Sequence, residues 1–387
     1  MNILIVPSWY KTKSNPTLGS FFFEQAKMLK ALGHNVIIAD VTLQGRKDYF
    51  SGRCYRLIKE EDNDILVYSY VTPSFGRFNS TDAGCDSVYK NLKHIYARIL
   101  NDGYKIDIIH AHSYLPAGIV AVRLGNETGI PVVVTEHASD VLNRCLNDKR
   151  IELLKYVLSE CNRFICVGNR LKQSVIELTD CKEEDIQIIP NVVDPVFKYK
   201  EENKKNDNYT FISVGNLVFS KRFDLTIDAF SELFKCSPNI RLNIVGDGPL
   251  RKPLEDHVKH LGLTDRISFY GRINREAVAK LLQESDCFVL PSDYETFGVV
   301  YIEALAVGLP VIGTKNGGAE DIITSDNGIL VDKNNVTQLR EAMQELYCES
   351  NEYDRRQLSY ETSSKYGQKN IGKILESLYK NLLNMNG

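Results

Sequence analysis

The stretch CFVLPSDYETFGVVYIEALAVG, residues 287–308, joins a short apolar run to a second apolar run of helical length through a polar turn. Residues 287–290 predict a buried strand, residues 291–296 a loop, and residues 297–307 a helix that opens at Gly298. The turn therefore follows the carboxyl end of a strand, which is where open α/β sheets bind their ligands.

The start of this helix is a predicted anion site. Unpaired N–H groups and the helix dipole favour negative charge there, so Phe297, Gly298 and Val299 are candidate contacts to a phosphate. Two carboxylates frame the turn, Glu295 just before the helix and Glu303 in its second turn. With a diphosphate at the helix start, the two acids would reach opposite ends of the ligand, and each can accept hydrogen bonds from a pair of hydroxyls. A sugar nucleotide carries hydroxyls on both sides of its diphosphate.

A simpler interpretation makes Glu295 a solvated loop residue and Glu303 a surface residue of the helix. Glu303, however, lies within VVYIEALAVG, which is apolar nearly all round, so we expect its helix to be largely buried. A buried acid needs a partner.

The run E-T-F-G-V-V-Y-I-E, residues 295–303, and the glycine pair of T-K-N-G-G-A-E, residues 314–320, resemble the E-x7-E signature of the family-4 retaining glycosyltransferases. Strand, glycine-bearing helix start and glycine loop follow in the order that this signature requires. The runs S-W-Y, N-P-x-x-G, F-x-x-E-Q-A-K, H-A-H-S-Y-L-P-A-G and T-E-H-A-S-D further resemble bacterial cell-surface polysaccharide enzymes of this family, of the capsule or teichuronic-acid type. The resemblance implies an α/β protein with two doubly wound Rossmann-like domains facing a central cleft, the GT-B fold.

Length and composition agree with two ordinary globular domains. The chain has 387 residues, more than one core usually supports, with 43% apolar and 25% charged residues. A formal net charge of −3 argues against a dedicated nucleic-acid binder. Nine cysteines without a C-x-x-C pair or a zinc pattern indicate reduced core residues. No apolar run reaches transmembrane length and no basic signal sequence opens the chain, so we expect a cytoplasmic protein.

Apolar strands alternate with helical stretches on both sides of one charged run, which predicts parallel sheets covered on both faces. That run, KYKEENKKNDN at residues 198–208, lacks aliphatic residues and indicates a surface linker. We therefore expect an N-terminal acceptor domain over residues 1–195 and a C-terminal donor domain over residues 196–366. The resemblance implies that the last helix, about residues 367–387, joins the first domain.

The segment GNLVFSK, residues 215–221, precedes a predicted helix with Ser220 as its N-cap and Lys221 and Arg222 in its first turn. Two cations there oppose the helix dipole, so either both are solvated or a bound diphosphate reverses the sign of the effect. The segment resembles the family motif in which an arginine and a lysine hold the donor phosphates, which implies that role for Lys221. Asn216 stands where that arginine is usual, and whether Arg222 compensates is left open.

Two further loops follow strands of the second domain. Gly246, Asp247 and Gly248 form a glycine turn that lets the backbone approach a ligand closely. Alone such a turn is more often structural, whereas its place at a strand end and the resemblance favour a nucleotide contact. Arg272 and Ile273 follow the next strand, and the family implies mainly backbone and apolar contacts to the base there.

In the first domain, His110 and His112 lie on one side of a strand at its carboxyl end, because side chains alternate with a period of two. Paired histidines can hold a metal, but no third ligand follows at a familiar spacing, so we expect none. The resemblance implies that His137, after the next strand, contacts the donor sugar or its phosphate. His112 either positions an acceptor or packs. Gly19, before a helix, can bring backbone N–H groups to the diphosphate.

Two patterns have simpler explanations. Asp62-Asn63-Asp64 matches the D-x-D metal motif of other glycosyltransferases, but it precedes a strand, so we predict a solvated turn and no metal cofactor. Residues 11–59 carry nine Lys or Arg against three Asp or Glu, near aromatic runs. Such a patch can contact an anionic membrane leaflet weakly, at the inner face of the cell membrane. We prefer the simpler explanation, in which the basic residues are scattered over the surface and the aromatic residues form a buried helix face.

We predict a retaining hexosyltransferase that moves a sugar from a nucleoside diphosphate sugar, with UDP favoured, to a hydroxyl of a glycan or lipid-linked saccharide in cell-surface polysaccharide synthesis. Lys221 and helix N-termini would stabilise the leaving diphosphate without a metal. Glu295 would orient the sugar and Glu303 the ribose. A sugar-nucleotide epimerase of the same fold and a non-catalytic nucleotide-sugar-binding subunit stay as alternatives.

Overall fold

The computed structural model describes residues 1–11, 18–41, 43–44, 56–70, 72–73, 82–201, 208–349 and 353–385. The chain divides into two compact units, residues 1–192 with 371–387 and residues 193–370. The N-P-x of the N-P-x-x-G run and much of the basic stretch over residues 11–59 lie outside the described residues. None of the described helices is long and apolar enough to cross a membrane.

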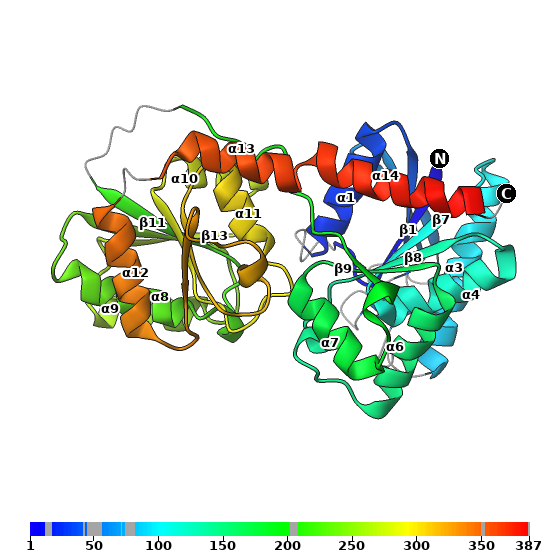
Figure 1. The fold of residues 1–387 in the computed structure, drawn as a ribbon, viewed down its shortest axis with the longest axis horizontal. Coiled ribbons are helices and arrows are strands. Elements are labelled where there is room, and N and C mark those ends of the chain that lie inside the picture. Colours follow the sequence, from blue (N-terminus) through cyan, green and yellow to red (C-terminus); the bar gives the residue numbers. More distant parts are fainter. Residues whose placement is uncertain are drawn as a thin grey trace. The chain divides into compact units, whose positions relative to one another are not determined.

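The first unit is built on an eight-stranded sheet with the strand order β10-β9-β8-β7-β1-β2-β5-β4 (Figure 1). All neighbours pair in parallel except β4 and β5, which are antiparallel. The strands are β1 (Asn2–Pro7), β2 (Asn35–Asp40), β4 (Leu57–Asp62), β5 (Ile65–Tyr70), β7 (Ile108–His112), β8 (Val132–Glu136), β9 (Arg163–Cys166) and β10 (Ile186–Ile188). A separate pair joins β3 (Leu43–Gln44) and β6 (Thr72–Pro73).

Helices cover both faces of this sheet, as the near-continuous apolar strands require. Figure 1 shows α1 and α14 on one face and α3, α4 and α6 on the other. The helices are α1 (Ser20–Ala31), α3 (Asp82–Asn101), α4 (Ile119–Thr128), α5 (Ser139–Leu142), α6 (Asp148–Glu160), α7 (Asn169–Thr179) and α14 (Gln368–Met385). From Ile371 onward α14 belongs to this unit, and its apolar side chains join the same core as β1 and α1.

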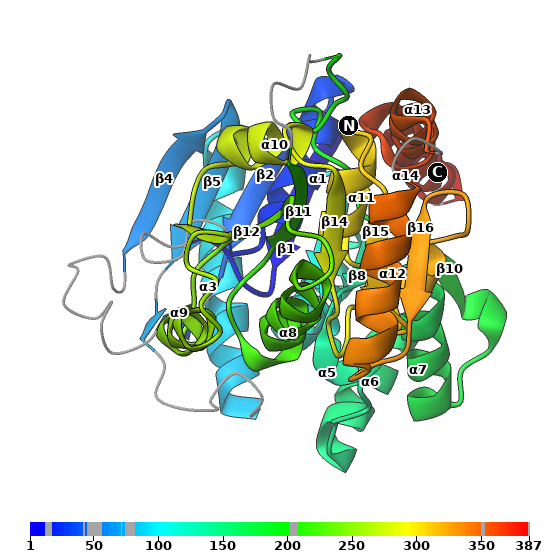
Figure 2. The same cartoon turned by 90° about the vertical axis from the view of Figure 1, so that its left-hand side faces the viewer.

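The second unit has a six-stranded, all-parallel sheet with the order β13-β12-β11-β14-β15-β16 (Figure 2). Its strands are β11 (Tyr209–Val214), β12 (Ile240–Val245), β13 (Ile267–Gly271), β14 (Cys287–Leu290), β15 (Val311–Thr314) and β16 (Gly328–Val331). Its helices are α8 (Phe223–Phe234), α9 (Arg251–His260), α10 (Arg275–Gln283), α11 (Val299–Ala306), α12 (Val336–Cys348) and α13 (Arg355–Tyr366). Each unit is thus a doubly wound, Rossmann-like layer structure, and the prediction of an α/β protein with two such domains is confirmed.

In both sheets the strand order reverses at one point, between β1 and β7 in the first unit and between β11 and β14 in the second. The crossovers leave these two neighbouring strands in opposite directions, so the loops after them part and expose a crevice at their carboxyl ends. Any ligand site of either sheet is expected there.

The antiparallel strand β4 has no apolar run that predicts a strand, because its residues are mostly polar and half its side chains are exposed. It joins β5 through a tight turn in which Asn63 (φ 49°) and Asp64 (φ 60°) adopt left-handed backbone angles. Two such residues in succession are typical of a type I′ hairpin. The D-x-D run is therefore an exposed hairpin turn, as predicted.

A buried polar contact joins helix α14 to the sheet. The Tyr379 hydroxyl lies 2.6 Å from Nδ1 of His110, and both residues are fully buried. Tyr379→Phe leaves that nitrogen without a partner, so we expect the free energy of unfolding of the first unit to fall by about 1 to 3 kcal/mol. Urea unfolding followed by the fluorescence of Trp9, the chain's single tryptophan, measures it.

The matched control is Tyr360→Phe in α13, whose side chain is 69% exposed. This change should alter the free energy of unfolding by no more than about 0.5 kcal/mol. Equal effects of the two substitutions would show that the buried contact does not stabilise the unit.

Candidate functional site

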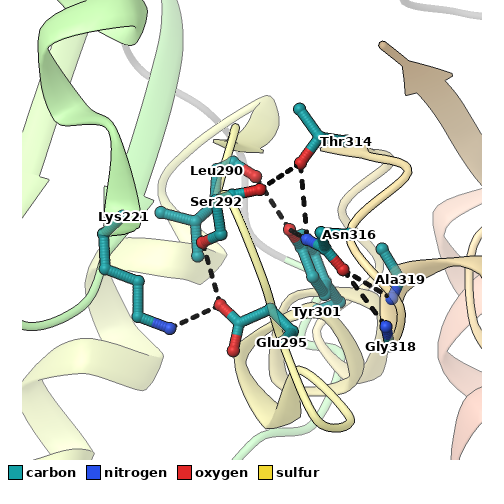
Figure 3. Close-up of polar contacts among 9 residues, drawn as sticks. All are labelled: Lys221, Leu290, Ser292, Glu295, Tyr301, Thr314, Asn316, Gly318 and Ala319. Atoms are coloured by element: carbon teal, nitrogen blue, oxygen red, sulfur yellow. Dashed lines mark hydrogen bonds and ion pairs between the residues drawn. The ribbon is translucent and has the colours of Figure 1, made fainter. Parts of the chain in front are cut away.

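Lys221 and Glu295 meet across the reversal point of the second sheet (Figure 3). Lys221 lies on the loop after β11 and Glu295 on the loop after β14, and their Nζ and Oε1 atoms are 2.5 Å apart. Ser292 Oγ donates to the same carboxylate oxygen at 2.9 Å. The side chains are only 23% and 12% exposed, so their charges interact with little screening by water. The structure thus brings together two of the three predicted catalytic residues.

The backbone around Lys221 differs from the prediction. Phe219–Lys221 forms a 3-10 turn, and α8 begins only at Phe223, with Arg222 at the N-cap position. The predicted helix start at Lys221 with Ser220 as N-cap is therefore wrong. Arg222 has a left-handed φ of 51°, which ends the 3-10 turn before the helix can begin. Lys221 consequently lies outside the first turn of α8 and is free to extend toward Glu295.

Helix α11 begins with a glycine for a steric reason. Gly298 has a φ of 91°, and a Cβ there would lie 2.5 Å from the Tyr301 ring. The Tyr301 hydroxyl donates to the carbonyl of Leu290 at 2.7 Å, which fixes the helix against the end of β14. No side chain among the described residues caps the helix, so its first N–H groups, including that of Val299, can donate to an anion. The Phe297 ring is buried against Tyr366, so only its backbone can contact a ligand.

Asn316, in the glycine loop over residues 314–320, connects this loop to α11 and to the loop that carries Glu295 (Figure 3). Its Oδ1 accepts from the N–H groups of Gly318 (3.2 Å) and Ala319 (3.0 Å), and its Nδ2 donates to the Tyr301 hydroxyl (3.2 Å). Its carbonyl accepts from the N–H of Glu295 at 3.2 Å. We assigned Asn316 no role from the sequence, although an asparagine two residues before a glycine commonly makes such a turn.

Glu303 is buried, as predicted, and the partner it requires is Arg275. Arg275 Nη2 donates to Glu303 Oε1 at 2.8 Å, and its Nε donates to Asp194 Oδ2 at 3.0 Å. Burial raises the pKa of Glu303, and the nearby guanidinium opposes that rise. The sequence indicated only that a partner was needed, because Arg275 lies 28 positions before Glu303 in the chain.

The glycine turn after β12 has a structural reason. Gly246 has a φ of 138°, and a Cβ on it would lie 1.8 Å from the carbonyl oxygen of Gly215. A Cβ on Gly248 would lie 2.5 Å from the carbonyl oxygen of Leu217. The two loops therefore pack backbone to backbone, and the Asp247 carboxylate accepts from the N–H of Gly248 at 2.8 Å. Contacts of this turn with a nucleotide stay a prediction.

The other residues predicted for the second domain lie at the ends of the same strands. Asn216 follows β11 and is exposed, and Arg272 and Ile273 follow β13, exposed and half-buried respectively. Their predicted roles toward the nucleotide stay predictions.

Gly19, His112 and His137 gather at the carboxyl edge of the first sheet. His112 ends β7, His137 follows β8, and His112 Nδ1 lies 3.1 Å from His137 Nε2. Phe22 in the first turn of α1 packs on both imidazoles, with ring centroids 4.6 Å from His112 and 5.2 Å from His137. Gly19 (φ 70°) caps α1, and a Cβ on it would lie 3.0 Å from the Phe22 ring. His110 stacks on His112 at 4.6 Å, which confirms that both point to one side of the strand.

The three imidazoles are neutral around pH 7. Burial lowers the pKa of His110 and His137 to about 3 and that of His112 well below its ordinary value. Nε2 of His112 is buried without a hydrogen-bond partner among the described residues. A buried N–H is costlier to leave unpaired than a lone pair, so we place the His112 proton on Nδ1, from which it donates to His137 Nε2. The same assignment places the proton of the neutral His137 on its Nδ1.

Glu136, at the end of β8, fixes the backbone beside His137. Its carboxylate accepts from the N–H groups of Tyr114, His137 and Ala138 at 2.6 to 2.8 Å. Burial raises the pKa of Glu136 to about 6, against the lowering effect of these hydrogen bonds. The sequence showed T-E-H-A-S-D but gave no reason to separate this acid from its neighbours.

No three His, Cys, Asp or Glu side chains are grouped to hold a metal ion in the part of the chain that the structure describes.

Comparisons with known proteins agree with this geometry. Residues 197–364 match the family described as Glycosyl transferases group 1, and residues 18–197 match Glycosyltransferase Family 4. A relative named as an uncharacterized glycosyltransferase of Methanocaldococcus jannaschii is 34% identical over 62% of this chain and 65% of its own length. A protein of Homo sapiens named as a subunit of phosphatidylinositol N-acetylglucosaminyltransferase is 27% identical over 85% of this chain and 66% of its own. In both cases the match spans slightly less than two thirds of the relative.

Among solved structures, HepE of Anabaena in complex with UDP-glucose superposes with a TM-score of 0.72. The match covers 98% of this chain and 100% of that one at 18% sequence identity. At that identity the likeness shows a shared fold.

The neutral histidines make the stability of the first unit depend on pH. In the unfolded chain they titrate near 6.5, so between about pH 6.5 and pH 3 the unfolded state binds more protons than the folded state. The free energy of unfolding should therefore fall as the pH falls through this range. Glu136, with its raised pKa, opposes the fall where it titrates. His110→Gln should make the fall shallower by about one bound proton.

Urea unfolding followed by Trp9 fluorescence between pH 7 and pH 4 measures this slope. Tyr360→Phe, which removes no histidine, is the control and should leave the slope as in the native sequence. A slope that His110→Gln leaves unchanged would mean that folding does not lower the pKa of His110.

Proposed function

The chain belongs to the glycosyltransferases, with a family 4 region before residue 197 and a group 1 region after it, and on this premise we propose a reaction for it. It transfers a sugar from a nucleoside diphosphate sugar to a hydroxyl of a glycan or lipid-linked saccharide, with retention of configuration and without a metal. One observation carries the proposal: the Lys221–Glu295 pair lies beside the glycine-capped start of α11. A cation and open N–H groups for a diphosphate thus adjoin a carboxylate for sugar hydroxyls.

Lys221 and the start of α11 act on the leaving diphosphate. As the bond to the sugar breaks, negative charge develops on the phosphate oxygens. An ammonium group and unpaired helix N–H groups stabilise that charge most when they are fixed in place before the reaction. Contacts that hold the helix start, such as the Tyr301 bond to Leu290, supply this rigidity.

Glu295 orients the donor sugar. Its Oε1 is engaged by Lys221 and Ser292, so Oε2 is the oxygen that accepts from a sugar hydroxyl. Because one carboxylate contacts both the lysine and the sugar, it fixes the distance between the diphosphate and the sugar ring. We further propose that the neutral His137 donates a hydrogen bond from its Nδ1–H to the sugar. Glu303, which is held by Arg275, accepts hydrogen bonds from the ribose hydroxyls.

Two comparisons support the choice of substrates. The HepE structures contain UDP and UDP-glucose, which supports a UDP-linked donor. The human relative is named for phosphatidylinositol, which supports an acceptor carried on a lipid. Calorimetric titration with a panel of UDP-, GDP- and ADP-sugars tests the donor directly. Incubation without an acceptor tests the alternative of an epimerase, which would release an epimerised sugar.

The two glutamates should be separable. Glu303→Gln should weaken UDP and UDP-sugar alike, whereas Glu295→Gln should leave UDP affinity intact and reduce transfer. Each change removes charge-assisted hydrogen bonds of about 1.5 to 3 kcal/mol, hence about tenfold to a hundredfold. Calorimetry with UDP and transfer rates measure the two effects. Glu284→Gln, at an exposed position of the same unit, is the control and should change neither quantity. Equal weakening of UDP by Glu295→Gln and Glu303→Gln would refute the assignment.

Transfer should continue in excess EDTA, because Lys221 and the α11 N–H groups take the part that a divalent cation plays elsewhere. The measurement is the initial rate with and without EDTA at saturating donor. Activity that disappears in EDTA and returns with Mg²⁺ or Mn²⁺ would refute metal independence.

A further inference from the structure

Arg222, the residue after Lys221, has an unusual backbone for its type. Its φ of 51° lies in the left-handed region, which costs a side-chain-bearing residue energy and which glycine adopts freely. Its side chain does not cap α8. A strained backbone persists only where surrounding contacts hold it, so the reason for an arginine here must lie in its side-chain contacts.

The Arg222 guanidinium is surrounded by two carboxylates and an aromatic ring. Its Nε and Nη2 contact Asp224 at 3.2 and 3.0 Å, and its Nη1 lies 3.5 Å from Asp293 Oδ1. Its carbon lies over the Phe219 ring at 5.3 Å from the centroid. The side chain is 13% exposed. Two carboxylates offset its single charge, so it has little positive potential to offer a diphosphate.

Asp293 connects Arg222 to the loop that carries Glu295. It lies two residues before Glu295 on the loop after β14, and its N–H donates to the carbonyl of Ser220 at 2.8 Å. The loop after β11 and the loop after β14 are therefore joined at three places: Ser220 to Asp293, Arg222 to Asp293, and Lys221 to Glu295. Two of these three contacts involve Asp293.

We propose that Arg222 is a positioning residue that, through Asp293, holds the loop carrying Glu295 against the loop carrying Lys221. It does not replace the phosphate-binding arginine whose place Asn216 takes. The inference rests on the proposed function, since it concerns the geometry of the same donor site. It explains why this chain keeps an arginine where the backbone favours glycine.

Arg222→Gly provides the test, because it removes the guanidinium and suits the backbone angle. We expect Arg222→Gly and Asp293→Asn each to leave the Kd for UDP within about threefold, since neither group touches the phosphates. Each should lower kcat about tenfold to a hundredfold, because Glu295 is no longer held in place. The double variant should lose no more than the worse single variant, as expected for two members of one contact.

Arg144→Gly is a matched control. Arg144 also has a left-handed backbone, with a φ of 53°, and forms an ion pair with Glu177 in the first unit. The same substitution there should leave both UDP affinity and kcat unchanged.

A tenfold or greater loss of UDP affinity in Arg222→Gly, with none in Asp293→Asn, would overturn the inference and make Arg222 a phosphate ligand. A native kcat in Arg222→Gly would overturn it as well. If the native protein neither binds UDP nor transfers sugar, the proposed function fails. Urea unfolding of the native protein, Arg222→Gly, Asp293→Asn and the double variant then tests the contact between Arg222 and Asp293. Losses of stability that do not add would then support the link between the loops, and additive losses would refute it.

Discussion

The ion pair between Lys221 and Glu295 depends on the order of strands in the second sheet. Only because β11 and β14 are neighbours at the reversal point do the loops that follow them come within reach of each other. The approach also requires the glycine turn after β12, whose residues leave no room for a Cβ beside the loop after β11. An ammonium group has three N–H donors, so Lys221 can contact Glu295 and a phosphate oxygen together. In the proposed function, this pair sets the separation of a diphosphate and a sugar before either binds.

Most of this framework follows from the sequence, for one physical reason. Strands buried on both faces need continuous apolar runs, and these runs mark β14 and the helix α11 plainly. Elements that are partly exposed to water lack such continuous apolar runs. Helix α13 has no clear apolar pattern, because it buries hydroxyl side chains such as Ser359, which donates to the carbonyl of Ala306 at 2.5 Å.

The interior of the site was harder to predict, since its geometry comes from contacts distant in sequence. Ser220 is a residue type that suits an N-cap. In the structure, however, Arg222 takes the N-cap position of α8 with a left-handed backbone, and its side chain contacts Asp293, 71 positions away. Likewise, the predicted burial of Glu303 indicated that its carboxylate needs a partner, but not that this partner is Arg275. Sequence patterns thus located the charged residues at strand ends, and tertiary contacts decided which charges pair.

The polar groups at the two reversal points differ in their electrostatics, and the difference suits their proposed ligands. In the second unit, the charged Lys221–Glu295 pair is partly exposed, which suits a doubly charged diphosphate. In the first unit, burial holds His112 and His137 in the neutral form, and His112 fixes the position of the His137 proton. A neutral imidazole can donate to a sugar hydroxyl without offering the charge that would bind phosphate. Since its pKa is far below 7, this donor keeps its state over the whole neutral pH range.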